Sequence, residues 1–312
     1  MQIAAHLLED GRQKLRILSH GAITADWRVA LPGGGSAPVI MGHDDPAAYL
    51  GDDRYMGAIV GRVSGRIGQA RFSLAGRTWR LSRNQGRHHL HGGPGGLSRR
   101  NWDMQGDGAR AVRLTCRLEH GDDGYPGALD VQVDIRLEGG RLVYDMLATP
   151  DRPTPVSLAQ HNYYNLAGGG PIWGHRLRVA ARSFTETDAE LIPTGAVKPL
   201  PPEIDFSCGK TLAQQQHGAL DVNMVIPEGH DRDWPVAVLS TPGGLSLRLW
   251  SDQPGLQLYS GANLPLPGAG LCLEPQIWPD AVNHANFPSP IATPERPYRQ
   301  RLVLEIAPEA GR

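Results

Sequence analysis

The chain of 312 residues is poor in lysine and has no excess of charge of either sign. Lysine occurs only at Lys14, Lys198 and Lys210, and acidic and basic residues balance to a formal net charge of −1. Because the sequence has neither a basic stripe nor an acidic tail, we expect no nucleic-acid partner and no membrane partner. A neutral small molecule fits this charge balance better.

Cysteine and long apolar runs are also scarce. Cys116, Cys208 and Cys272 are an odd number at long spacings, which predicts no disulfide framework and indicates a reducing compartment. No stretch approaches the ~20 apolar residues of a membrane-spanning helix. Residues 1–18 lack the basic start and continuous apolar core of a signal peptide. We therefore expect a soluble, cytoplasmic protein.

Glycine and proline, in contrast, are abundant. The 39 glycines and 26 prolines predict many turns. Hydrophobic residues make up 40% of the chain, which is enough to bury a large core. No interval has the composition of a linker, and no repeat of fixed period is present. We expect one domain over residues 1–312, because large all-β domains of this size are common.

Apolar and polar residues alternate in many short runs. In residues 129–137 every second residue is Leu, Val or Ile, so all the apolar side chains lie on one face of a strand. Gly139 and Gly140 then form a turn, and residues 141–148 complete a hairpin. Further β-rich runs occupy residues 13–18, 24–30, 70–74, 77–81, 111–118, 235–239, 245–250 and 300–306.

Helical patterns are nearly absent, and only residues 211–217 are expected to form a turn or two of helix. Two segments rich in proline and glycine, residues 31–38 and 193–202, are expected to be loops at the rim of a sheet. A parallel α/β fold would need crossover helices that this chain does not supply. The sequence therefore predicts an all-β fold, a large antiparallel β-sandwich.

Residues 88–93 read His-His-Leu-His-Gly-Gly and have two functional interpretations. Alternate residues of a strand point the same way, so His89 and His91 could ligate a metal. No carboxylate follows them closely, and we therefore expect no metal site. In the second interpretation an imidazole donates a hydrogen bond to a substrate hydroxyl, and the glycines let the loop approach closely. His88 and His89 are expected to be surface or structural residues.

Residues 61–67 read Gly-Arg-Val-Ser-Gly-Arg-Ile and place two arginines among small residues. Arg62 and Arg66 are by default solvated surface residues. In a concave site, however, a guanidinium supplies rigid, permanently charged donors for hydroxyls or for developing negative charge.

Two further segments offer an acid and a base. Residues 157–168 contain His161, which titrates near neutral pH, among tyrosines and asparagines at the end of a predicted strand. A histidine in such a segment is by default structural. Residues 270–276 are apolar up to Glu274, so its carboxylate is expected to point into a cavity where desolvation raises its pKa. The alternative is an edge-strand glutamate in water.

Together these four segments resemble the aldose 1-epimerases, also called galactose mutarotases. The most similar part is Leu-Glu-x-Gln at 273–276, followed by Pro-Asp-Ala-Val-Asn-His-Ala-Asn-Phe-Pro at 279–288. The likeness runs from about residue 21 to residue 305. It implies a galactose mutarotase-like supersandwich, an isomerase that needs no cofactor, and a free monosaccharide as the substrate.

The resemblance also implies roles for single residues. Glu274 is the base and His161 the acid that exchange protons with the C1 hydroxyl and the ring oxygen, from opposite sides of the sugar. Four more residues bind the substrate: Arg66, His91, Asp221 and Gln257. Gly65 departs from the asparagine that the family usually has before this arginine, so one substrate-facing amide is missing.

Two other functions fit the same resemblance. One is a non-catalytic sugar-binding or regulatory protein on the same fold, which could lose the acid or the base. The other is an epimerase for a phosphorylated hexose, which would need a basic cluster, and the motifs contain no lysine. The preferred aldose and the oligomeric state are left open.

Overall fold

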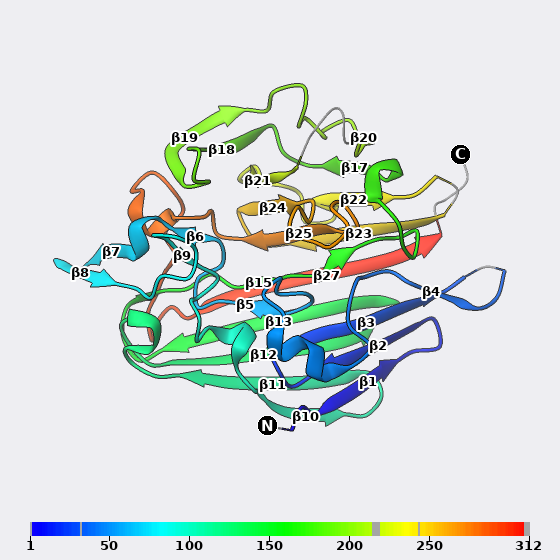
Figure 1. Ribbon diagram of the computed structural model, residues 1–312, viewed down its shortest axis with the longest axis horizontal. Coiled ribbons are helices and arrows are strands. Elements are labelled where there is room, and N and C mark those ends of the chain that lie inside the picture. The colour runs from blue at the N-terminus through cyan, green and yellow to red at the C-terminus, as the bar shows by residue number, and fades with distance from the viewer. Residues whose placement is uncertain (1, 32, 214–218, 243, 309–312) are drawn as a thin grey trace.

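The computed structural model describes residues 2–31, 33–213, 219–242 and 244–308, and the dominant regular structure among these residues is antiparallel β-sheet (Figure 1). The helical elements in this part of the chain are short 3-10 turns. They are η1 (Pro46–Gly51), η2 (Gly68–Ala70), η3 (Leu97–Arg99), η4 (Asp122–Gly124), η5 (Ile172–Gly174) and η6 (Ala281–Asn283). No helix of the described residues has the length and apolar character that crossing a membrane requires.

The largest sheet has nine strands. Their order is β10 (Asp103–Asp107), β11 (Ala111–Leu118), β12 (Leu129–Glu138), β13 (Arg141–Pro150), β27 (Tyr298–Pro308), β23 (Leu245–Ser251), β22 (Ala237–Ser240), β17 (Arg176–Val179) and β20 (Lys210–Thr211). The predicted hairpin is confirmed, because β12 pairs with β13 from Leu129 opposite Pro150 to Glu138 opposite Arg141. The alternating apolar side chains of β12 are buried, as their period of two requires.

A second sheet has six strands, and a third has four. The six-stranded order is β16 (Tyr163–Tyr164), β25 (Leu271–Gln276), β24 (Gly255–Tyr259), β21 (Asp221–Val225), β18 (Ser183–Thr187) and β19 (Pro193–Pro199). The four-stranded sheet is β1 (Ala5–Glu9), β2 (Gln13–Leu18), β3 (Ile23–Ala30) and β4 (Ser36–Pro38). Four two-stranded pairs complete the fold: β14 (Thr154–Pro155) with β26 (Ile291–Ala292), β15 (Ala159–Gln160) with β5 (Ile59–Val60), β6 (Arg66–Ile67) with β9 (His89–Leu90), and β7 (Arg71–Leu74) with β8 (Arg77–Arg80).

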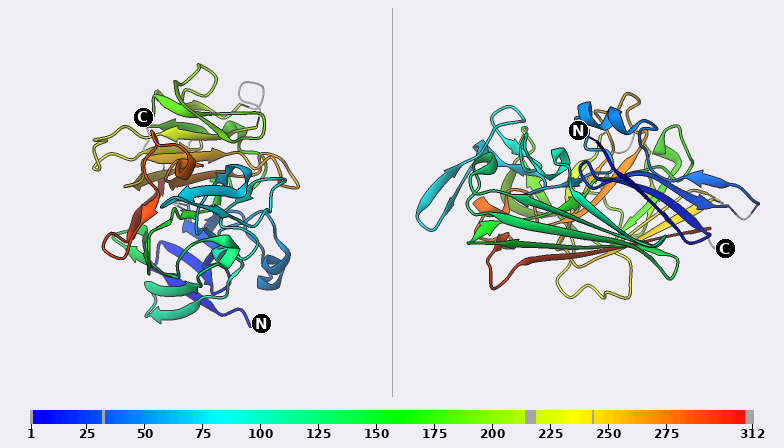
Figure 2. Two further views of the ribbon diagram at one scale, coloured as in Figure 1. Left: turned by 90° about the vertical axis from the view of Figure 1, so that its left-hand side faces the viewer. Right: turned by 90° about the horizontal axis from the view of Figure 1, so that it is seen from below.

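One continuous apolar core joins the three larger sheets. It includes Trp27 of β3, Tyr144 of β13 and Leu273 of β25, all essentially inaccessible to solvent. The right-hand view of Figure 2 shows the long strands of the nine-stranded sheet on one side, with the blue and cyan N-terminal segments across the other. The predicted antiparallel β-sandwich is therefore confirmed.

Both proline-rich segments contain short strands that were predicted to be loops. Pro193–Pro199 forms β19 and Ser36–Pro38 forms β4, and each is the edge strand of its sheet. An edge strand tolerates proline because one side of its backbone needs no ladder hydrogen bonds. The predicted helical turn at 211–217 begins in strand β20, and its residues 214–217 lie outside the described residues.

Candidate active site

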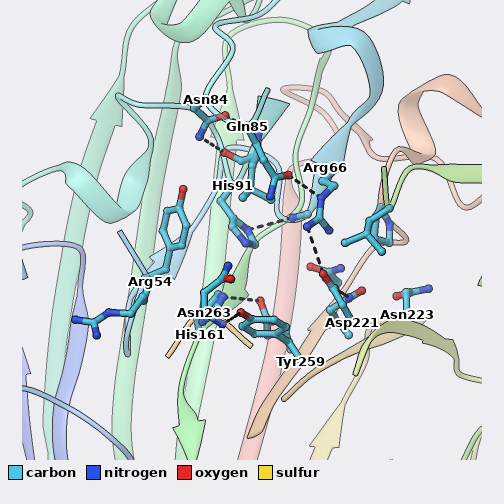
Figure 3. A pocket seen from close by; sticks show the side chains of 18 of the residues that line it. Arg54, Arg66, Asn84, Gln85, His91, His161, Asp221, Asn223, Tyr259 and Asn263 are labelled. Carbon is cyan, nitrogen blue, oxygen red and sulfur yellow. Dashed lines mark hydrogen bonds and ion pairs between the residues drawn. The ribbon is translucent and has the colours of Figure 1, made fainter. Parts of the chain in front are cut away.

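A pocket of about 510 Å³ lies among the described residues. Strands β21, β24 and β25 of the six-stranded sheet form one wall, and the loops around residues 53–55 and 84–94 form the other (Figure 3). The structure brings all six residues predicted for the site to this pocket. They are Arg66, His91, His161, Asp221, Gln257 and Glu274.

Strand register explains why residues from distant segments share one wall. Glu274 of β25 lies opposite Gln257 of β24, and Gln257 lies opposite Asn223 of β21. Directly opposed residues in neighbouring strands point to the same face of the sheet. Asp221 is two residues before Asn223, so the strand period of two puts it on that face as well.

Glu274 and His161 are neighbours in the interior of this pocket. The Nε2 atom of His161 lies 3.8 Å from Oε2 of Glu274, and both side chains are almost fully buried. His161 directly follows β15, as its predicted place at the end of a strand requires. Its Nδ1 atom lies 3.5 Å from Sγ of Cys272, and its backbone N–H donates to the carbonyl of Ala58. The imidazole is thus held with Nε2 toward the carboxyl group.

Burial shifts the pKa values of these two groups in opposite directions. Desolvation raises the pKa of Glu274 to about 8, the charge of Asp221 adds to this rise, and Arg66 opposes it. Desolvation lowers the pKa of His161 to about 4. Between these limits the pair holds one proton, and the two pKa values favour it on Glu274. Transfer of this proton across 3.8 Å gives the ion-paired form, with an anionic Glu274 and a cationic His161. The site therefore contains one proton donor and one proton acceptor at neutral pH.

His91 closes the pocket beside His161, and the two rings meet edge to face with centroids 5.3 Å apart. The backbone N–H of Gly65 donates to Nδ1 of His91, which leaves the Nε2 side of the ring for the pocket. Burial lowers the pKa of His91 well below its ordinary value, so the ring is neutral. The following glycine serves backbone packing, because a Cβ atom at Gly92 would collide with the backbone of Gly61.

Arg66, Asp221 and Gln257 form a hydrogen-bonded chain along the pocket. Figure 3 shows the contact between Arg66 and Asp221. Nη2 of Arg66 lies 3.3 Å from Oδ2 of Asp221, and Nε2 of Gln257 donates to Oδ1 of Asp221 at 2.6 Å. Nε of Arg66 also donates to Gln85 at 2.7 Å. Each side chain is therefore fixed by its neighbours before any ligand binds.

Arg62 lies away from this pocket, and its default interpretation as a solvated residue is wrong. Its side chain is buried and donates to the carbonyls of Pro126 and Gly127. Burial lowers its pKa to about 10. His88 and His89 are also buried, so neither is a surface residue, and His89 bonds to the hydroxyl of Tyr125.

Several polar residues of the pocket were not assigned to the site from the sequence, among them Asn223, Gln276, Arg54 and Arg99. Asn223 and Gln276 each lie two residues after a residue assigned to the site, so the strand period alone was enough to find them. Arg54 and Arg99 have no comparable signal, because they come from a loop and a 3-10 turn whose position depends on the tertiary fold.

The expectation of no metal site was based on the lack of a carboxylate near His89 and His91 in the sequence, but the fold brings one close to His91. Although no carboxylate follows His91 in sequence, ligand atoms of His91, His161 and Glu274 all lie within 4.8 Å of one another. Two imidazoles and a carboxylate are a donor set that divalent zinc accepts. The absence of a catalytic metal stays a prediction.

We expect catalysis to survive exhaustive chelation. His161 and Glu274 already supply a donor and an acceptor, so a metal occupying their lone pairs would block proton transfer. Polarimetric rates before and after dialysis against a strong chelator test this. Loss of the rate, with recovery only on adding a divalent metal, would make these three residues metal ligands.

The Aldose 1-epimerase family model matches residues 5–305. Galactose mutarotase of Rattus norvegicus is 33% identical over 96% of this chain and 93% of its own length. Aldose 1-epimerase of Escherichia coli K12 is 30% identical over 88% of this chain and 86% of its own. The crystal structure of an aldose epimerase homologue from C. elegans superposes with a TM-score of 0.93, at 26% identity over 99% of this chain and all of that one.

Proposed function

This chain belongs to the aldose 1-epimerase family and is an isomerase that acts on a sugar, and we propose that Glu274 and His161 carry out its two proton transfers. The observation that carries this proposal is their placement, with Nε2 and Oε2 separated by 3.8 Å inside the pocket. The opposite pKa shifts leave one proton on the pair over a wide pH range and favour it on Glu274, so the assigned roles require its transfer to His161 before the sugar reacts.

The proposed reaction opens and closes the ring of a free aldose. The proton of Glu274 first moves to His161 across 3.8 Å. The Glu274 carboxylate then takes the proton of the C1 hydroxyl while cationic His161 gives its proton to the ring oxygen, so the bond from C1 to that oxygen breaks. The C1 carbonyl then rotates, and closure on its other face reverses both transfers. Acid and base catalysis each contribute roughly 10²- to 10⁴-fold.

The acid and the base were expected on opposite sides of the sugar, yet the structure makes them neighbours. Neighbouring groups suit this reaction, because the C1 hydroxyl and the ring oxygen are bonded to the same carbon. Since the pair returns both protons at the end of each cycle, no cofactor is needed.

The remaining assigned residues are proposed to hold the sugar. Arg66 and His91 would bind hydroxyls and stabilise the oxygen on which negative charge grows. Asp221 and Gln257 would orient the ring. The chain of hydrogen bonds that links Arg66, Asp221 and Gln257 supports this role, because a fixed carboxylate costs little entropy when it binds a hydroxyl.

Polarimetry of freshly dissolved α-anomers tests the activity and identifies the preferred aldose. We expect the mutarotation rate of at least one hexose or pentose to rise in proportion to protein concentration. If the protein binds an aldose but accelerates no mutarotation, the chain is a non-catalytic sugar-binding protein.

The pH dependence of kcat/KM is expected to be bell-shaped, with limbs near pH 4 and pH 8. Below the lower limb both groups are protonated, so no acceptor remains. Above the upper limb both are deprotonated, so no donor remains. Rates corrected for buffer catalysis between pH 3 and 10 measure this. A kcat/KM that keeps rising above pH 9 would contradict the shared proton.

A phosphorylated hexose is the alternative substrate, and two arginines of the pocket make it worth testing. Arg54 and Arg99 line the pocket, but both donate to Asp52, Arg54 to its carboxylate and Arg99 to its carbonyl, each at 2.7 Å. Asp53, which precedes Arg54, also lines the pocket and adds a negative charge. We therefore favour a free aldose, and a higher kcat/KM for a hexose 6-phosphate than for the free hexose would reverse this choice.

A further inference from the structure

Gln276 faces the pocket from the same strand as the proposed base. It lies two residues after Glu274 on β25, so the strand period puts both side chains on one face, and both line the pocket. The residue is 0% exposed, and neither its Nε2 nor its Oε1 atom has a hydrogen-bond partner within the described residues. A buried amide without partners is costly, and such groups in native proteins usually have a functional reason.

The other buried glutamines of the described chain are all satisfied. The Nε2 atom of each donates to an oxygen: Gln13 to Gly140, Gln160 to Gly57, Gln253 to Asp252 and Gln300 to Pro275. Oε1 accepts from Trp27 in Gln13 and from Asn162 in Gln160, while the one hydroxyl proton of Tyr298 lies between Oε1 of Gln300 at 2.6 Å and Oε1 of Gln253 at 3.3 Å. The fold therefore provides partners for buried glutamines as a rule. Gln276 is the exception in this part of the chain, and it is also the one that lines the pocket.

A glycine leaves space beside the Gln276 amide. Gly65 lines the pocket with a φ of +71°, and a Cβ atom there would lie 3.6 Å from Nε2 of Gln276 and 3.1 Å from Cβ of Pro279. A side chain at position 65 would thus contact the Gln276 amide and narrow the pocket beside it.

We propose that Gln276 binds a hydroxyl of the substrate remote from C1, and so helps to determine which aldose this enzyme accepts. The inference rests on the proposed function, in which Glu274 meets the C1 hydroxyl. Residues two apart on a strand are about 7 Å apart, so Gln276 lies opposite the part of the sugar away from the reacting carbon. An amide suits a hydroxyl because Nε2 donates to it and Oε1 accepts from it.

Gln276→Met tests this with the preferred hexose of the polarimetric panel and the analogues that lack the hydroxyl at C2, C3, C4 or C6. Methionine keeps the volume of glutamine and removes both polar ends. We expect kcat/KM on the complete sugar to fall roughly 5- to 50-fold, the range for one lost hydrogen bond. On one of the analogues the native protein and the variant should be equally active, because the bound hydroxyl is already absent.

Thermal unfolding without sugar separates this binding role from a structural one. Gln276 has no partner to lose, so Gln276→Met should unfold at the native temperature or above it. Gln253→Met is the matched control, because Gln253 is buried and hydrogen-bonded outside the pocket. The control should unfold at a lower temperature than the native protein. Its kcat/KM on each deoxy analogue, relative to that on the complete sugar, should equal the native ratio.

Two results would overturn the inference. In the first, each of the four deoxy analogues lowers kcat/KM relative to the complete sugar by the same factor in Gln276→Met as in the native protein. The second is a lower unfolding temperature for Gln276→Met, as in the control. Both presuppose an active native protein, so a native protein without mutarotase activity would instead contradict the proposed function.

Discussion

Replacing Glu274 with glutamine is expected to lower kcat by about two to four orders of magnitude while KM changes little. Glutamine keeps the shape of the side chain and its ability to hydrogen-bond, but it cannot take a proton from the C1 hydroxyl. Initial mutarotation rates over a range of sugar concentrations separate kcat from KM. Near-normal turnover on every aldose that the native protein accepts would exclude Glu274 as the base.

Asp221→Ala is the contrasting variant for this measurement. Asp221 is proposed to orient the ring, so its loss should raise KM, with any loss of kcat smaller than in Glu274→Gln. Arg66 and Gln257 both hydrogen-bond to this carboxylate and would lose a partner in the same variant. A pure loss of kcat at unchanged KM would place Asp221 in the proton transfers instead.

His161→Asn is expected to lower kcat by a similar factor, roughly 10²- to 10⁴-fold. Asparagine keeps a hydrogen-bonding side chain but has no group that gains and loses a proton near neutral pH. The residual activity should also lose the alkaline limb of the pH profile and rise with pH as Glu274 loses its proton, because the variant keeps the acceptor and has no donor to lose.

The double variant Glu274→Gln/His161→Asn provides the control for both single variants. If the two residues act as one proton-sharing unit, the double variant should be little slower than the slower single variant. Losses that multiply would show that the two groups act independently. A His161→Asn protein with native kcat and an unchanged alkaline limb would exclude His161 as the acid.

The sequence predicts those strands in which apolar and polar residues alternate because one face packs on the core. The run 129–138 alternates because one of its faces packs on the core, so its period of two is visible in the sequence. Strand β19 was missed because its prolines resemble a loop, and only the position of a strand in its sheet shows that it is an edge.

The active-site residues required more than local pattern. The resemblance to a family, confirmed by the comparisons, supplied the six assigned residues, whereas no local signal brings His91 close to Glu274 across the chain. Arg62 and Arg66 stand in one short segment, yet one is a buried structural residue and the other lines the pocket. Their difference depends on carbonyl groups from residues 126–127, which the segment itself does not contain.

Some expectations from the sequence concern properties outside the active site. One domain over residues 1–312, a cytoplasmic location and the lack of nucleic-acid and membrane partners stay predictions. The proposed activity is argued separately from the six assigned site residues, all of which lie in the described part of the chain.

Anomer exchange at equilibrium is the most direct test of proton transfer by Glu274 and His161. Saturation-transfer NMR on an equilibrated solution of the preferred aldose measures the rate at which the α and β forms interconvert, without any net reaction. The account predicts that the native protein accelerates this exchange at an unchanged anomer ratio, and that Glu274→Gln and His161→Asn bring it close to the rate in buffer. An exchange rate with native protein equal to that in buffer, or unchanged in both variants, would contradict the account.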